Sequence, residues 1–98
     1  MPTFVCLFNW TDQGIRNVRD TTKRAERFKA AIKKAGGTTK GIYWTLGRYD
    51  GLFVFEVPDE ETATAIMLSG GMLGSVRTET LRAFEASEMD KVLAKMKA

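Results

Sequence analysis

The residues best suited to bind a ligand or transfer a proton lie in one short segment, Gly47-Arg48-Tyr49-Asp50-Gly51. A guanidinium group binds anions, a phenol donates a proton and a carboxylate orients a partner, so Arg48, Tyr49 and Asp50 are candidate ligand-binding residues. Tyr49 and Asp50 are also the candidate catalytic pair for a proton transfer. The alternative is structural, because an Asp-Gly pair favours a hairpin turn and a tyrosine packs over a sheet edge.

A further candidate ligand-binding residue is Arg82. Alternation along a predicted strand puts it in line with the apolar Val76 and Phe84, where a guanidinium needs an anionic partner. Glu56 is one candidate partner. A structural ion pair is therefore the alternative to a bound ligand at this position.

The two tryptophans complete the candidate binding set. Trp10 and Trp44, together with Tyr43, offer a flat aromatic wall for a planar ligand if the strands bring them together. The alternative is that these aromatic residues pack in the core or at an interface between subunits.

Composition excludes several kinds of site. The 98 residues include no histidine and one cysteine, Cys6, which lies in an apolar stretch. Histidine is the commonest general base and metal ligand, so Ser-His and Cys-His nucleophiles are excluded and no metal site is expected. We also expect no cofactor. Cys6 has no second cysteine to pair with and is expected to behave as a small core residue.

Charge is distributed unevenly along the chain. Residues 12–48 hold ten Lys or Arg against three Asp or Glu, whereas residues 49–98 hold five against nine, for a net charge of +3. A basic stretch is either a nucleic-acid footprint or, more often, a solvated helix face, so nucleic acid is an unlikely partner. No apolar run approaches the ~18 residues of a membrane span, and no signal peptide is evident. We expect a cytoplasmic protein without a membrane partner.

The elements that must position these residues begin with an apolar strand over residues 3–10. Apolar residues then recur every three or four positions from Ile15 to Ala35, which predicts a helix with a break or second cap near Asp20. Gly36 and Gly37 end this helix.

The second half of the sequence predicts two more strands, a helix, a strand and a final helix. Residues 38–46 and 52–57 are rich in β-branched and aromatic residues and form a hairpin. Acidic residues after Pro58 begin a helix that ends near Gly70-Gly71. Residues 75–83 form the fourth strand, and Ser87 is the expected cap of the last helix.

This β-α-β-β-α-β order predicts a single α+β domain over residues 1–98, with the ferredoxin-like sandwich of a four-stranded antiparallel sheet and an extra C-terminal helix. The first and third strands are apolar on both faces, so the face away from the helices also needs a cover. We predict a homodimer joined through the open sheet faces.

Four segments in order also resemble the GYD domain family: residues 9–15, 41–50, 56–59 and 77–84. The Gly and Tyr-Asp of the family name are separated here by Arg48. The resemblance spans about Thr3 to Phe84 and implies the dimeric ferredoxin-like α/β-barrel group. It supplies no reaction, because the family is functionally uncharacterised.

Three functions remain open at this point. A small-molecule-binding or regulatory homo-oligomer is favoured by apolar strands with few ionisable groups. A cofactor-independent isomerase or monooxygenase is the second hypothesis, by analogy with the dimeric α/β-barrel group. Nucleic-acid binding is the third, because ferredoxin-like sheets include an RNA-binding type with stacking aromatics on its strands.

Overall fold

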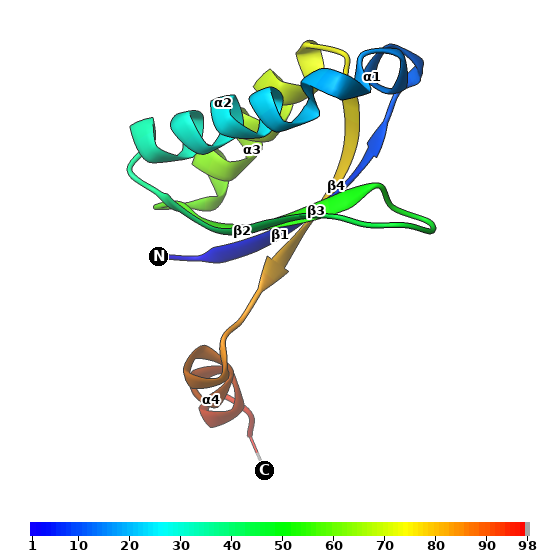
Figure 1. The fold of residues 1–98 in the computed structure, drawn as a ribbon. Coiled ribbons are helices and arrows are strands. Elements are labelled where there is room, and N and C mark those ends of the chain that lie inside the picture. Colours follow the sequence, from blue (N-terminus) through cyan, green and yellow to red (C-terminus); the bar gives the residue numbers. More distant parts are fainter. Residues whose placement is uncertain (98) are drawn as a thin grey trace.

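The computed structural model describes residues 1–97. In chain order the elements are β1 (Thr3–Trp10), α1 (Asp12–Arg16), the 3-10 turn η1 (Val18–Asp20), α2 (Thr21–Lys34), β2 (Thr38–Trp44), β3 (Gly51–Glu56), α3 (Glu60–Met72), β4 (Val76–Ala83) and α4 (Ala86–Ala94). The strands form one antiparallel sheet in the order β2-β3-β1-β4. Figure 1 shows α2 and α3 on one face of the sheet and α4 on the other side. The predicted ferredoxin-like arrangement with a trailing helix is confirmed.

The predicted first helix is divided into three parts. Thr11 caps α1, since its side-chain oxygen accepts a hydrogen bond from the N–H of Gly14 at 3.1 Å. α1 ends at Asn17, η1 follows, and α2 begins at Thr21. The interruption expected near Asp20 is therefore present and begins three residues earlier in the chain.

In the hairpin, β2 is shorter and the loop is longer than predicted, while β3 has its predicted length but begins one residue earlier. β2 ends at Trp44, and the loop occupies residues 45–50. The N–H of Thr45 donates to the carbonyl oxygen of Asp50 at 2.9 Å, and its hydroxyl donates to the carbonyl oxygen of Tyr49 at 2.7 Å. These bonds fold the chain back at Thr45 and end the strand there.

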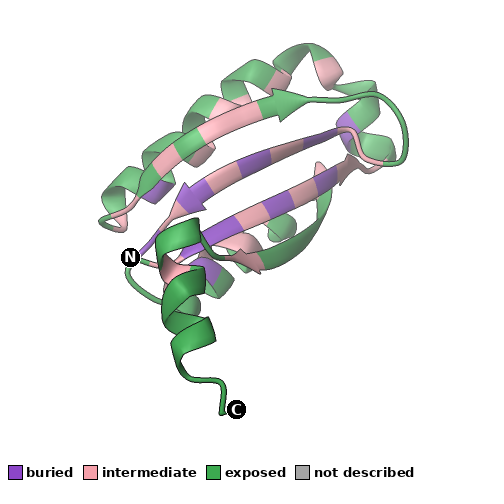
Figure 2. Cartoon of the chain, turned by 90° about the horizontal axis from the view of Figure 1, so that it is seen from below, coloured by how far each residue is buried: buried purple, intermediate pink, exposed green. Residues whose placement is uncertain are grey.

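The core lies between the sheet and the two covering helices. Alternate residues of the central strands point toward α2 and α3, and Figure 2 shows the resulting alternation of burial along β1 and β3. Four phenylalanines stack and tilt against one another in this layer at centroid distances of 5.6 to 6.0 Å. The buried core residues are Phe4, Cys6, Phe8, Ile32, Phe53, Phe55, Val57 and Ala63.

The opposite face of the sheet, here called the open face, carries an aliphatic row. Val5 pairs with Val54 and Leu81, and Leu7 pairs with Leu52, so all five side chains lie on one side. Leu81 is 46% exposed and the others are half-buried. α2 and α3 both lie on the far side of the sheet from this row (Figure 1).

The two edge strands are irregular or charged. β2 has a register shift between Thr39 and Gly41, which leaves Lys40 outside the regular pairing with β3. β4, at the other edge, carries Arg77 and Glu79 among its exposed residues.

The N-terminus of α4 differs from the sequence prediction. Its cap is Glu85 and not Ser87, which lies inside the helix. Glu85 and Glu88 form a reciprocal capping box, in which the N–H of Glu85 donates to the Glu88 carboxylate at 3.2 Å. The prediction failed because a carboxylate two residues earlier satisfies the first helical N–H groups as well as a serine hydroxyl does.

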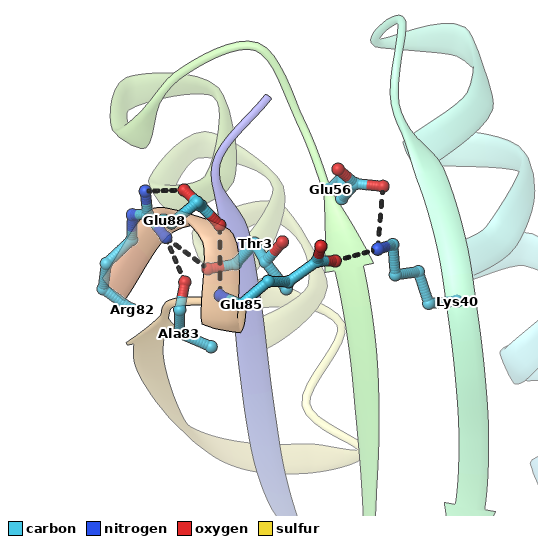
Figure 3. A network of polar contacts seen from close by, with 7 residues as sticks. All are labelled: Thr3, Lys40, Glu56, Arg82, Ala83, Glu85 and Glu88. Atoms are coloured by element: carbon cyan, nitrogen blue, oxygen red, sulfur yellow. Dashed lines mark hydrogen bonds and ion pairs between the residues drawn. The ribbon is translucent and has the colours of Figure 1, made fainter. Parts of the chain in front are cut away.

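Lys40 joins α4 to the sheet (Figure 3). Its ammonium group contacts the carboxylate of Glu56 at 3.3 Å and also pairs with that of Glu85. The hydrogen bond to Glu85 is the main reason that the pKa of Lys40 is raised above its usual value.

Among residues 1–97, no helix is both long enough and apolar enough to cross a membrane.

Candidate ligand-binding site

A pocket of about 400 Å³ opens between α2, α3 and the covered face of the sheet. We call it the helix-face pocket. Its walls are almost entirely apolar, and its main apolar side chains are Phe8, Phe28, Ile42, Trp44, Phe53 and Ile66. The 3.6-residue repeat of α2 supplies Phe28, and the strand alternation supplies the other aromatic residues. This volume and character are typical of small-molecule sites.

Trp44 forms part of the pocket wall at the end of β2. Its indole N–H donates a hydrogen bond to the Thr21 hydroxyl oxygen at 3.0 Å, which connects the sheet to the first turn of α2. Trp44 is 41% exposed, so it lies at the boundary between the pocket and solvent.

The other tryptophan, Trp10, is not among the residues that line the pocket. Trp10 packs edge-on against Phe8 at 6.4 Å, and its indole N–H has no hydrogen-bond partner among the described residues. Tyr43 is adjacent to Trp44 on β2, so its side chain points to the open face. The predicted aromatic wall of Trp10, Trp44 and Tyr43 is therefore not assembled on one face of the sheet.

The loop at residues 45–50 contacts the end of β1. The Asp50 carboxylate accepts a hydrogen bond from the backbone N–H of Trp10 at 2.9 Å, and the side-chain amide of Asn9 lies 3.4 Å away. The same amide donates to the carbonyl oxygen of Arg48 at 2.8 Å. Asp50 thus holds the loop against the sheet, and this geometry gives its carboxylate a structural role.

Arg48 and Tyr49 lie beside each other in that loop. The Arg48 guanidinium lies 5.6 Å from the centre of the Tyr49 ring, and the Tyr49 hydroxyl is 3.5 Å from the Glu79 carboxylate of β4. Neither residue lines the helix-face pocket, and neither does Asp50. The structure brings this predicted trio together as neighbours but away from the pocket.

Arg82 is paired with α4. Its guanidinium contacts the Glu88 carboxylate at 3.2 Å and donates to the carbonyl oxygen of Thr3 at 3.3 Å (Figure 3). The guanidinium also lies 4.4 Å from the centre of the Phe84 ring. The N–H of Glu85, and then Arg82, hold the pKa of Glu88 below its usual range. Arg82 is thus occupied by protein groups.

The suggested pairing of Arg82 with Glu56 is wrong. Glu56 pairs with Thr3, which pairs with Ala83, so Glu56 faces the open side, while Arg82 is opposite Phe4 on the helix side. The carboxylate of Glu56 pairs with Lys40 instead, and the Arg82 guanidinium pairs with Glu88.

Cys6 is fully buried in the covered face. Burial raises the pKa of its thiol from 9.0 to about 11, and the nearby hydroxyls of Thr80 and Thr78 offset part of that rise. The thiol is therefore protonated near neutral pH and is no nucleophile.

Within residues 1–97, no three His, Cys, Asp or Glu side chains gather in a way that would hold a metal ion.

Sequence reasoning missed most of the pocket. Arg24 and Arg27 of α2, and Ile66 and Met67 of α3, all line it, together with Gly70. The spacing between two helices is set by side-chain packing, which the periodicity of a sequence does not report. The small residues in both helices were the available signal.

Comparisons with known proteins agree with the fold and with the four sequence segments that resemble the GYD domain family. The sequence pattern of the GYD domain family matches residues 4–93. The chain belongs to the GYD domain family. This GYD protein is 31% identical over 90 residues to the "Glutamine synthetase and cystathionine beta-lyase binding protein" of Thermus thermophilus, covering 91% of this chain and 95% of that one.

A solved structure supports the same conclusion about this GYD protein. The crystal structure of a protein from Thermus thermophilus superposes with a TM-score of 0.56 at 26% identity, covering 88% of this chain and 96% of that chain. The family expected from the residues is thereby confirmed. The name of the relative at 31% identity describes a protein that binds enzymes, and it states no reaction.

Proposed function

We propose that this GYD protein is a regulatory homodimer that binds a small apolar molecule in the helix-face pocket. The observation that carries the proposal is the apolar pocket of about 400 Å³ next to an otherwise closely packed aromatic core. An apolar cavity forfeits the contacts that its walls would make, so it costs stability unless a molecule fills it. A bound apolar molecule would restore these contacts and offset the lost stability.

The homodimer is proposed from the open face. Its aliphatic row, Val5, Leu7, Leu52, Val54 and Leu81, runs across three neighbouring strands and is only partly buried. A second copy related by a two-fold axis presents the same row, which makes the face self-complementary. Covering this apolar area is favourable by roughly 25 cal/mol per Å² removed from water.

Native mass spectrometry of the protein as purified from cells tests both parts. We expect a dimer that carries a reproducible extra mass. A monomer at micromolar concentration contradicts the homodimer. A clean dimer whose mass and melting temperature stay unchanged with every apolar compound of a broad set contradicts the ligand.

A matched pair of variants sharpens the dimer test. Val54→Lys places a charge in the open-face row and is expected to give a monomer. Ala30→Lys adds the same side chain at an exposed position on α2 and is expected to leave the dimer intact. Equal behaviour of the two variants would count against the open face as the interface.

A second candidate function is contact with another protein, and one feature favours it. α4 projects from the sheet with an exposed apolar side, and the relative at 31% identity is named for binding two enzymes. The exposed apolar residues of this C-terminal part are Phe84, Met89, Val92, Leu93 and Met96. Co-elution with a purified glutamine synthetase tests it: Leu93→Glu should abolish co-elution, whereas Ala94→Glu should not.

A further inference from the structure

The charged groups of the helix-face pocket are all of one sign. Arg24 and Arg27 line it, and no Asp or Glu is among its lining residues. Within the described part of the chain, the ion pairs of cationic side chains involve Lys29, Lys40 and Arg82, so neither pocket arginine is neutralised by a carboxylate. Two uncompensated guanidinium groups at an apolar pocket favour an anionic ligand group.

Arg24 is held in place before any ligand arrives. It is half-buried, and its two Nη atoms donate to the carbonyl oxygens of Asn17 at 3.0 Å and Gly14 at 3.5 Å. A guanidinium has five N–H donors, so these bonds leave others for a ligand. Arg27 follows three residues later on α2, which puts it one turn along the same side of the helix.

A hydroxyl group adds a neutral donor to the same region. Thr21 lines the pocket, and its oxygen accepts the indole N–H of Trp44. A hydroxyl that accepts one bond can still donate its own proton. Arg24, Arg27 and Thr21 all come from the first two turns of α2, so they supply donors to one side of the pocket.

The rest of the pocket admits no charge. Phe28, Phe53, Ile66 and Met67 supply apolar walls, and burying an ionised group among them without a partner is strongly unfavourable. The ligand must therefore have an apolar body and place its charged group at the arginines.

From this arrangement we infer that the helix-face pocket selects an apolar monocarboxylic acid, with its carboxylate at Arg24 and Arg27 and its hydrocarbon body between α2, α3 and the sheet. The inference rests on the proposed small-molecule function and adds the chemical class. A neutral molecule of the same shape lacks the ionic contacts, and a cationic one meets two like charges.

Three compounds with one hydrocarbon chain test the class: octanoate, octanol and octylammonium. Titrations by calorimetry should give octanoate an affinity about tenfold above that of octanol, as expected for hydrogen bonds to a charged group, with octylammonium weakest. The methyl resonance of Met67, which lines the pocket, should shift on titration, whereas those of Met89 and Met96, which do not line it, should not.

Charge-neutral variants test whether Arg24 and Arg27 cause the preference for octanoate. Arg24→Gln/Arg27→Gln should lower octanoate affinity about tenfold and leave octanol affinity unchanged, which also shows that the pocket is intact. Lys23→Gln/Lys33→Gln removes two charges from the same helix at exposed positions that do not line the pocket. This control should keep the preference for octanoate.

The Gly70→Phe variant distinguishes two outcomes: a pocket that binds ligands other than carboxylic acids, and a pocket that binds no small molecule. Gly70 lines the pocket, and a Cβ atom there would meet no heavy atom within 4 Å, so a large side chain can be accommodated and should block binding of all three compounds. Equal binding of octanoate and octanol that Gly70→Phe abolishes overturns the acid class but supports the proposed function. Three compounds that leave the Met67 methyl unmoved overturn both.

Discussion

The two faces of the sheet are made from the same strands but differ in the side chains they present. On β1 and β3, the face toward α2 and α3 carries phenylalanines, four of which are buried, and the open face carries valines and leucines that stay half-buried. Phe55 and Val54 are neighbours in sequence and belong to different faces. The comparison teaches that the fold of one chain buries the first face, while the apolar residues of the second face stay partly exposed in a single chain.

The largest expected effect comes from the covered face. Phe55→Ala removes a fully buried ring that packs against Phe4, Phe28 and Phe53, and should lower the free energy of unfolding by about 3–5 kcal/mol. Urea unfolding followed by tryptophan fluorescence measures this loss. A loss below about 1 kcal/mol would mean that this face is loosely packed and would remove the contrast.

Alkaline pH should weaken the same face through Cys6. Its thiol ionises near pH 9 in the unfolded chain and near pH 11 when buried, because burial raises the pKa, so the folded protein keeps a proton that the unfolded chain releases. Stability should be fully present below about pH 9 and decline by about 2–3 kcal/mol as the pH rises to about 11.

The control for this pH effect is Cys6→Ala, because lysines and tyrosines also ionise in that range. We expect the decline in urea-measured stability to be shallower in the variant than in the parent protein. Parallel curves would show that the thiol contributes nothing to the alkaline loss.

A medium effect is expected at the loop over residues 45–50, which contacts the end of β1. Asp50→Ala leaves the backbone N–H of Trp10 without its carboxylate partner and should cost about 1–2 kcal/mol. Asp50→Asn keeps an oxygen acceptor and should cost less. Thermal unfolding of both variants measures the difference, and a reversed order would contradict the structural role of Asp50.

The smallest effect is expected on the open face. Val54→Ala should cost about 1 kcal/mol, and if two copies share this face the cost should grow with protein concentration. The cost of Phe55→Ala should not depend on concentration in that way. Melting temperatures of both variants across a hundredfold dilution test this, and identical dilution behaviour would break the comparison between the faces.

The fold could be predicted from local patterns, and much of the pocket could not. The apolar runs at residues 3–10 and 52–57 and the helical repeat after Ile15 specify which elements form, because run length and period distinguish strands from helices. The partner of Arg82 depends on the direction of α4, and the pocket depends on the gap between α2 and α3. Both are consequences of packing between distant segments, so residue spacing alone located Trp44 but not Arg24.

The irregular edge of β2 has a consequence for how far association can go. A regular, unpaired edge would offer its N–H and C=O groups to any extended chain and could add strands without limit. The register shift between Thr39 and Gly41, with the charged Lys40 beside it, interrupts that ladder, and β4 places Arg77 and Glu79 along the opposite edge. Strand-by-strand growth into fibrils is thereby disfavoured at both edges of the sheet.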